Sequence, residues 1–172
     1  MGPTANLGSI LYLGGIVGFS KGSIKNCTND ADIALTSSYS KKSRLGGIAG
    51  TCDKSSTDTL KDLKNNGSIM GGAYVGGIVG DGFEGQSRII NAENYGIVSG
   101  GVNVGGVCGQ RCFVQNGENR GNIVISDGSA NMYVGGIVGF WGSELGSLNY
   151  GEINIVSDSG AYVGGVDGCP FI

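Results

Sequence analysis

The chain has 172 residues, of which 36 are glycine, 2 are proline and none is histidine. Glycine without a Gly-X-Y period excludes collagen, and an apolar content of 40% excludes a disordered linker. Without histidine, Ser/His/Asp and Cys/His catalysis, zinc fingers and HExxH chemistry are excluded, so we predict no metal site and no cofactor. The net charge of −3 argues against nucleic-acid binding, and no apolar run approaches the roughly 20 residues of a membrane helix, so no membrane insertion is expected.

Two short blocks alternate along the chain and define a tandem repeat. The first block, Asn-x-Gly-x-Ile/Val, has copies that start at Asn6, Asn29, Asn65, Asn94, Asn119 and Asn149, with Ala31 in place of glycine in the second copy. The second block, Gly-Gly-Ile/Val-x-Gly, starts at Gly14, Gly46, Gly76, Gly105, Gly135 and Gly164, with spacings of 32, 30, 29, 30 and 29 residues. We interpret residues 1–172 as one repeat domain, a segment of a longer array, with repeats near 6–28, 29–64, 65–93, 94–118, 119–148 and 149–172.

Equivalent positions of the repeats form columns with distinct characters. The residues on either side of each Gly pair are aliphatic. Two positions before the pair stands a mixed column that indicates exposure to solvent: Tyr12, Arg44, Tyr74, Asn103, Tyr133 and Tyr162. The fourth position of the Gly-Gly block accepts a charge at one end of the chain: Val17, Ala49, Val79, Cys108, Val138 and Asp167.

These patterns predict an all-β fold, a β-solenoid (parallel β-helix) of about six coils of ~30 residues. Glycine every few residues excludes helical repeats, because glycine inside a helix costs roughly 1 kcal/mol relative to alanine. Val75 and Ile78 are three residues apart yet both columns are apolar, so we expect a corner or bulge at Gly76-Gly77 that returns the second side chain to one shared core. The Asn column is expected at another corner, with stacked amides hydrogen-bonded between coils.

At these blocks the sequence resembles the GLUG-type repeats of bacterial surface proteins. The resemblance rests on Tyr74-Val75-Gly76-Gly77-Ile78-Val79-Gly80 and on Asn26-Cys27-Thr28-Asn29 with their counterparts, and covers nearly the whole chain. Such repeats occur in large adhesin-like proteins and in non-catalytic regions of some IgA-cleaving metallopeptidases. The resemblance implies a secreted bacterial protein, extracellular or at the cell surface, that acts as a structural stalk or a cell-adhesion module.

Ligand contacts are expected at the loops of variable length between the blocks, because loops on a rigid scaffold usually carry binding. The tyrosines of the mixed column, Tyr12, Tyr74, Tyr133 and Tyr162, are candidates for stacking on sugar rings, and ordinary cross-strand pairing explains them equally well. Expected partners are a glycan or host surface ligand and a second copy stacked head to tail. Residues 1–64 carry eight Lys/Arg and five Asp/Glu (+3), whereas residues 65–172 carry three and nine (−6).

The remaining reactive side chains favour a non-enzymatic protein. The five cysteines, Cys27, Cys52, Cys108, Cys112 and Cys169, are expected to be buried free thiols, with a disulfide between neighbouring coils as the alternative. Asp127 and Asp158 fit turns better than calcium sites. The alternative function is a carbohydrate-active β-helix, a polysaccharide hydrolase or lyase. It would need acids converging on one groove, for which Asp53, Asp58, Asp62 and Glu84 are the nearest set.

Overall fold

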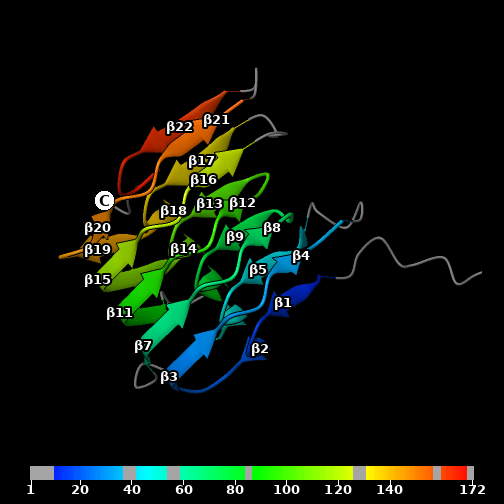
Figure 1. Cartoon of the computed structure of the whole chain (residues 1–172), viewed down its shortest axis with the longest axis vertical. Coiled ribbons are helices and arrows are strands. Elements are labelled where there is room, and N and C mark those ends of the chain that lie inside the picture. The colour runs from blue at the N-terminus through cyan, green and yellow to red at the C-terminus, as the bar shows by residue number, and fades with distance from the viewer. Residues whose placement is uncertain are drawn as a thin grey trace, which may run out of the picture.

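The fold is a parallel β-solenoid, seen in a computed structural model that describes residues 10–36, 42–53, 59–83, 87–125, 131–156 and 160–169. Its strands belong to four sheets, here called A to D in the order in which the chain visits them in each coil. All strand pairs join equivalent strands of successive coils and are parallel. Figure 1 shows the coils stacked from the blue N-terminal strands to the red C-terminal strands. No membrane-crossing helix is found among the described residues.

Sheets A and B flank the Gly-Gly block. Sheet A contains β1 (Tyr12–Gly14), β5 (Arg44–Gly46), β9 (Tyr74–Gly76), β13 (Asn103–Gly105), β17 (Met132–Gly135) and β22 (Ala161–Gly164). Sheet B contains β2 (Val17–Ser20), β6 (Ala49–Cys52), β10 (Val79–Asp81), β14 (Cys108–Gln110) and β18 (Val138–Phe140). The strands are short because a corner interrupts the chain at each glycine pair.

Sheets C and D flank the Asn block. Sheet C contains β3 (Ile24–Asn29), β7 (Leu60–Asn65), β11 (Ser87–Asn94), β15 (Cys112–Asn119), β19 (Ser143–Leu145) and β20 (Leu148–Asn149), the last two both pairing with β15. Sheet D contains β4 (Ile33–Ala34), β8 (Ile69–Met70), β12 (Val98–Ser99), β16 (Ile123–Ile125) and β21 (Ile153–Ile155).

The predicted fold class is confirmed, but the predicted number of coils is slightly too high. Sheets B and D each have five strands, and five stacked strands span only four turns. The sixth Gly-Gly block, at Gly164, contributes β22 and a single bridge between Val138 and Asp167. The first Asn block, at Asn6, lies outside the described residues. The described chain therefore makes fewer than six complete coils.

The Asn column forms the predicted hydrogen-bonded ladder. In each described coil the side-chain Nδ2 of the asparagine donates to Oδ1 of the asparagine in the next coil, at 2.8 Å: Asn29 to Asn65, Asn65 to Asn94, Asn94 to Asn119 and Asn119 to Asn149. The same nitrogen also donates to the carbonyl two residues ahead, for example from Asn94 to Gly96 at 2.8 Å. Asn65, Asn94 and Asn119 are fully buried, so the ladder satisfies polar groups that solvent cannot reach.

A second, exposed column of Asn and Asp also has a structural explanation. Asn26, Asp62, Asn91 and Asn116 all have φ between 53° and 56°, the left-handed region that Asn and Asp tolerate best. Gly146 takes the equivalent place three residues before Asn149, with φ 65°. Asn91 Nδ2 donates to Asp62 Oδ1 at 2.9 Å, and Asn116 Nδ2 donates to Asn91 Oδ1 at 3.2 Å.

The interior contains two apolar clusters, not the single shared core expected from the sequence. Ile78 packs in the cluster between sheets B and C, whereas Val75 packs in the cluster between sheets A and D, although both are completely buried. The predicted corner at the glycine pair is present, but it directs the two side chains to opposite clusters. The clusters are separate because sheets A and B contact each other backbone to backbone. A Cβ on Gly80 would lie 2.6 Å from the backbone N of Leu45.

Candidate binding surface

The best candidate for a functional surface is the seam where sheets A and B meet. On the sheet A side lies the mixed column of Tyr12, Arg44, Tyr74, Asn103, Tyr133 and Tyr162. On the sheet B side lies a second column, Phe19, Thr51, Asp81, Gln110 and Phe140. We call these two columns the A/B seam. Residues such as Gly50 and Gly80 have no side chain, so the backbones of sheets A and B lie in contact there. This contact brings the two columns close to each other.

The mixed column is less exposed than its composition predicts. Arg44 is 8% and Asn103 is 4% exposed, while Tyr12, Tyr74 and Tyr133 are half-buried and only Tyr162 is exposed. The expectation of a solvent-facing column is therefore wrong at Arg44 and Asn103 and holds only in part at the three half-buried tyrosines. The periodicity of the mixed column does not predict its burial, because the residues that cover it belong to the column on sheet B.

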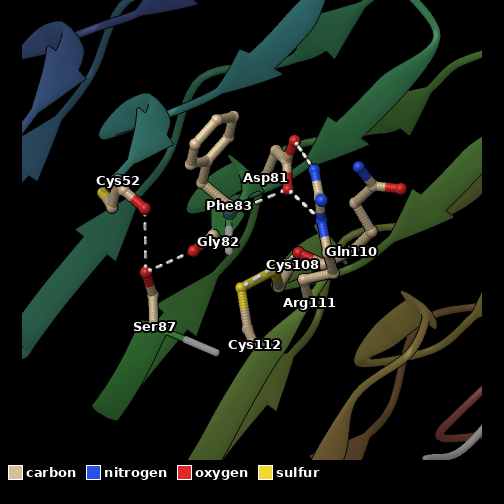
Figure 2. Close-up of a disulfide and its surroundings, with 9 residues drawn as sticks. All are labelled: Cys52, Asp81, Gly82, Phe83, Ser87, Cys108, Gln110, Arg111 and Cys112. Carbon is tan, nitrogen blue, oxygen red and sulfur yellow. Dashed lines mark hydrogen bonds and ion pairs between the residues drawn. A yellow bond between two sulfur atoms is a disulfide. The ribbon is translucent and has the colours of Figure 1, made fainter. Parts of the chain in front are cut away.

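Asp81 is the electrostatic centre of the seam. Its carboxylate is completely buried and accepts hydrogen bonds from Arg44 Nε, at 2.5 Å, and from Arg111 Nε and Nη2, at 2.9 and 2.5 Å. Figure 2 shows the Arg111 side chain reaching this carboxylate. Burial alone would raise the pKa of Asp81, but the hydrogen bonds from Arg111 and Arg44 lower it overall. Asp81 is therefore charged, and it holds together side chains from three successive coils.

Arg111 reaches Asp81 from an unusual backbone conformation. It follows β14 with φ 58°, and Trp141, one coil further, has φ 51°. A left-handed conformation is costly for such side chains and persists only where surrounding contacts impose it. The bidentate ion pair with Asp81 provides such a contact for Arg111.

Most ring faces in the seam are already covered. The Arg44 guanidinium lies 5.3 Å from the ring centroid of Tyr12 and 5.5 Å from that of Tyr74, so it sits between the two rings. Tyr133 stacks on Tyr162 with centroids 5.0 Å apart. The sugar-binding hypothesis for the tyrosine column therefore concentrates on its C-terminal end.

At that end four rings form a continuous cluster, which we call the aromatic cluster: Tyr133, Phe140, Trp141 and Tyr162. Tyr133 and Phe140 are 4.4 Å apart, and Phe140 and Trp141 are stacked at 5.5 Å. Trp141 is 49% and Tyr162 is 56% exposed. Large, partly exposed aromatic side chains are the residues that binding surfaces favour.

Inside the seam, three buried polar atoms have no hydrogen-bond partner among the described residues. They are Arg44 Nη1, Thr51 Oγ1 and Asn103 Oδ1. The other amide atom of Asn103, Nδ2, donates to Gln110 Oε1 at 2.6 Å. The seam thus combines buried polar groups with aromatic side chains.

A second aromatic and basic ladder lies on the opposite corner of the coil. Tyr95, Arg120 and Tyr150 each follow the ladder asparagine of their coil, and all three are exposed. The Arg120 guanidinium lies 4.6 Å from the Tyr150 centroid and 6.0 Å from that of Tyr95, and Lys64 covers Tyr95 at 4.6 Å. Cationic side chains of neighbouring coils therefore already cover these rings, as ordinary cross-strand pairing predicts.

The cysteines differ from the prediction at one pair, and Cys27 and Cys169 are half-buried, not buried. Cys108 and Cys112 are buried, as expected of Cys108, but they form a disulfide within one coil, from β14 to β15 (Figure 2). The three residues between them bring the two sulfurs together. We expected either free thiols or a disulfide between neighbouring coils, and a disulfide within one coil is neither. Cys27, Cys52 and Cys169 are free. Burial, and secondarily the charge of Asp81, raises the pKa of the Cys52 thiol to about 12.

The acidic candidates do not form a common site in the described chain. Asp53 is half-buried and Asp62 is exposed in its asparagine-type column. Asp58, Glu84, Asp127 and Asp158 lie outside the described residues. No group of three metal-binding side chains occurs within the described ranges. A different acidic pair, Glu144 and Asp167, lies beside Val114 and Val138 in the last described coil of the cluster between sheets B and C.

Comparison of the chain with protein-family models, with curated proteins and with solved structures finds no match in any of the three.

Proposed function

We propose that this chain is a non-enzymatic extracellular repeat module that acts as a rigid stalk or adhesin segment of a bacterial surface protein. The observation that carries the proposal is the unbroken stacking of the four sheets, reinforced by the buried asparagine ladder. Each added coil extends the same contacts, so such an array gains length and stiffness with every repeat. That is the property a spacer needs.

The proposed extracellular location is supported by the Cys108–Cys112 disulfide. Both sulfurs are buried in the B/C cluster, and disulfides persist mainly in oxidising compartments such as the cell exterior.

The proposed adhesive contact is a glycan or another host surface ligand, taken up by the aromatic cluster and by the loops of variable length. Tyr162 and Trp141 offer exposed rings, and Asn103 and Gln110 of the A/B seam lie beside Tyr133 and Phe140 of the same cluster. We further propose that copies of the module associate head to tail. The charges of the two portions, +3 in residues 1–64 and −6 in residues 65–172, are opposite and favour this order of stacking.

A panel of bacterial, plant and host glycans tests the first proposal, with binding and glycan chain length both measured. Retention without shortening, weakened by Tyr162→Ala and Trp141→Ala but not by Tyr95→Ala, is the result expected of an adhesin. Neither binding nor shortening is the result expected of a spacer. Shortening that is lost in Asp53→Asn would overturn the proposal in favour of a polysaccharide hydrolase or lyase.

A further inference from the structure

The middle of the A/B seam holds more positive than negative charge. Arg44 and Arg111 share one carboxylate, that of Asp81, so two guanidinium groups face a single counter-charge. The Asp81 side chain is completely buried, and those of Arg44 and Arg111 are only 10% and 28% exposed. Burial penalises charge that is not compensated. These three side chains therefore leave an excess positive charge in a place with little access to water.

Arg44 uses only part of its guanidinium for the ion pair with Asp81. Its Nε donates to Asp81 Oδ2, whereas its Nη1 is buried and has no hydrogen-bond partner among the described residues. A guanidinium distributes its five N–H donors around its plane, so Nη1 donates in a different direction from Nε. The ring centroids of Tyr12 and Tyr74 lie 5.3 and 5.5 Å from the central carbon of the guanidinium. One donor of a buried cation is thus available for a further acceptor.

Thr51 presents a second unpartnered group to the same part of the seam. It lies between Phe19 and Asp81 in the register of sheet B. The other described residues of this column all contact the sheet A column, in the pairs Phe19–Tyr12, Asp81–Arg44, Gln110–Asn103 and Phe140–Tyr133. Thr51 is completely buried, and its hydroxyl has no hydrogen-bond partner in the part of the chain that the structure describes.

We propose that Arg44 Nη1 and Thr51 Oγ1 bind a small monovalent anion, chloride, inside the A/B seam. An anion accepts hydrogen bonds from both the N–H and the O–H group, and it balances the second guanidinium charge. The third unpartnered atom of the seam, Asn103 Oδ1, is an acceptor and lies two coils further along sheet A, so it does not contribute to an anion site. The inference goes beyond the stalk or adhesin role and does not depend on it.

Size and charge together select this ligand. Both donor atoms are enclosed, so the carboxylate of an acidic sugar would reach them only if the rings of Tyr12 and Tyr74 moved aside. A water molecule would satisfy both hydrogen bonds but would leave the excess positive charge unbalanced. A halide ion is a single atom that accepts hydrogen bonds from any direction, so it imposes no particular orientation on the two donors.

Crystals of the chain grown in sodium bromide test the site directly, because bromide scatters X-rays anomalously and water does not. We expect a bromide ion in hydrogen-bond contact with Arg44 Nη1 and Thr51 Oγ1. Density for water at this position without an anomalous signal would overturn the proposal. An anomalous peak only beside the exposed part of Arg111 would show an adventitious ion only, and would overturn it as well.

Thermal unfolding in solution tests the linked stability. Sodium chloride is replaced by sodium gluconate, whose anion is too large for the seam, at a constant ionic strength of about 0.15 M. The melting temperature of the wild type should be about 2 to 4 °C higher in chloride. Thr51→Val removes the buried hydroxyl and should lose most of this difference, whereas Thr28→Val, at an exposed threonine of sheet C, should keep it.

Asp81→Asn gives a readout that a purely structural role of the seam would not move. The variant removes the carboxylate that competes for the two guanidinium groups, so its chloride dependence should exceed that of the wild type. If it does not fold, the comparison of the wild type with Thr51→Val still decides. Equal chloride dependence of those two proteins would overturn the site. Bromide in the crystal without a chloride effect in solution would show binding at crystal concentration only, which also overturns the proposal.

Discussion

Gly77 and Asn94 lie in direct contact, 17 residues apart in sequence, where the two repeated blocks of one coil fold against each other. A Cβ placed on Gly77 would lie 2.3 Å from Cγ of Asn94 and 2.2 Å from the carbonyl oxygen of Gly106 in the next coil. The second glycine of each pair in the five N-terminal blocks meets its ladder asparagine in the same way: Gly15, Gly47, Gly77, Gly106 and Gly136. The second glycine of the pair is therefore required by both the ladder asparagine and the backbone of the next coil.

Replacement of Gly77 by alanine is expected to destabilise the rod by about 2 to 4 kcal/mol, because the new methyl group must displace backbone of the next coil and the buried ladder. Gly22→Ala is the matched control. A Cβ at Gly22 would have no neighbour within 4 Å, so the free energy of unfolding should change by less than about 0.5 kcal/mol. Urea denaturation followed by circular dichroism measures both. Equal stability of the two variants would contradict the proposed contact.

Removal of one ladder amide should cost more than removal of an exposed one. Asn94→Ala leaves the Asn65 Nδ2, the Asn119 Oδ1 and the Gly96 carbonyl without their partner, and we expect a loss of about 2 to 4 kcal/mol. Asn91→Gly removes an exposed amide at a left-handed residue, where glycine fits without strain, and should cost less than about 1 kcal/mol. The same denaturation experiment compares them, and hydrogen exchange should show the loss of protection around residue 94 in the first variant alone.

Asp81 makes the stability of the seam depend on pH. Its pKa is lowered in the folded protein, so its contribution is present above the unfolded value of about 3.8 and is lost as the pH falls through the lower, folded value. Asp81→Asn leaves Arg44 and Arg111 partly or fully buried without a counter-charge, and about 3 to 5 kcal/mol of stability should be lost at neutral pH. Melting temperatures between about pH 2 and pH 7 should then show a shallower acid dependence in the variant than in the wild type. If the melting temperature of the variant depends on acid pH as steeply as that of the wild type, other carboxylates, not Asp81, cause the dependence.

Thiol labelling checks the disulfide and the free cysteines together. In denaturant without reductant, three thiols should react: Cys27, Cys52 and Cys169. With reductant the number should rise to five. In the native protein Cys52 should stay unlabelled at pH 8, because it is buried and its pKa of about 12 leaves little thiolate. Five reactive thiols without reductant would show that Cys108 and Cys112 are not joined.

Several contacts of the rod follow from the sequence alone, since parallel stacking places equivalent residues of neighbouring repeats side by side. The spacing of about thirty residues between Gly-Gly blocks gives the register of β5 on β9 directly, with Leu45 beside Val75 and Gly46 beside Gly76. The asparagine ladder follows from the same periodicity, and so do the fold class and the corners at the two blocks.

Only the tertiary structure decided which different columns meet. Nothing periodic links Arg44 to Asp81, or Glu144 to Asp167, because these contacts depend on how each coil folds in cross-section. That cross-section is set by glycine, which lets sheets A and B touch through their backbones and divides the interior into two clusters. The burial of Arg44 and Asn103, the pairing of Cys108 with Cys112 and the meeting of Glu144 with Asp167 are consequences of this folding of the coil, which a one-dimensional repeat does not contain.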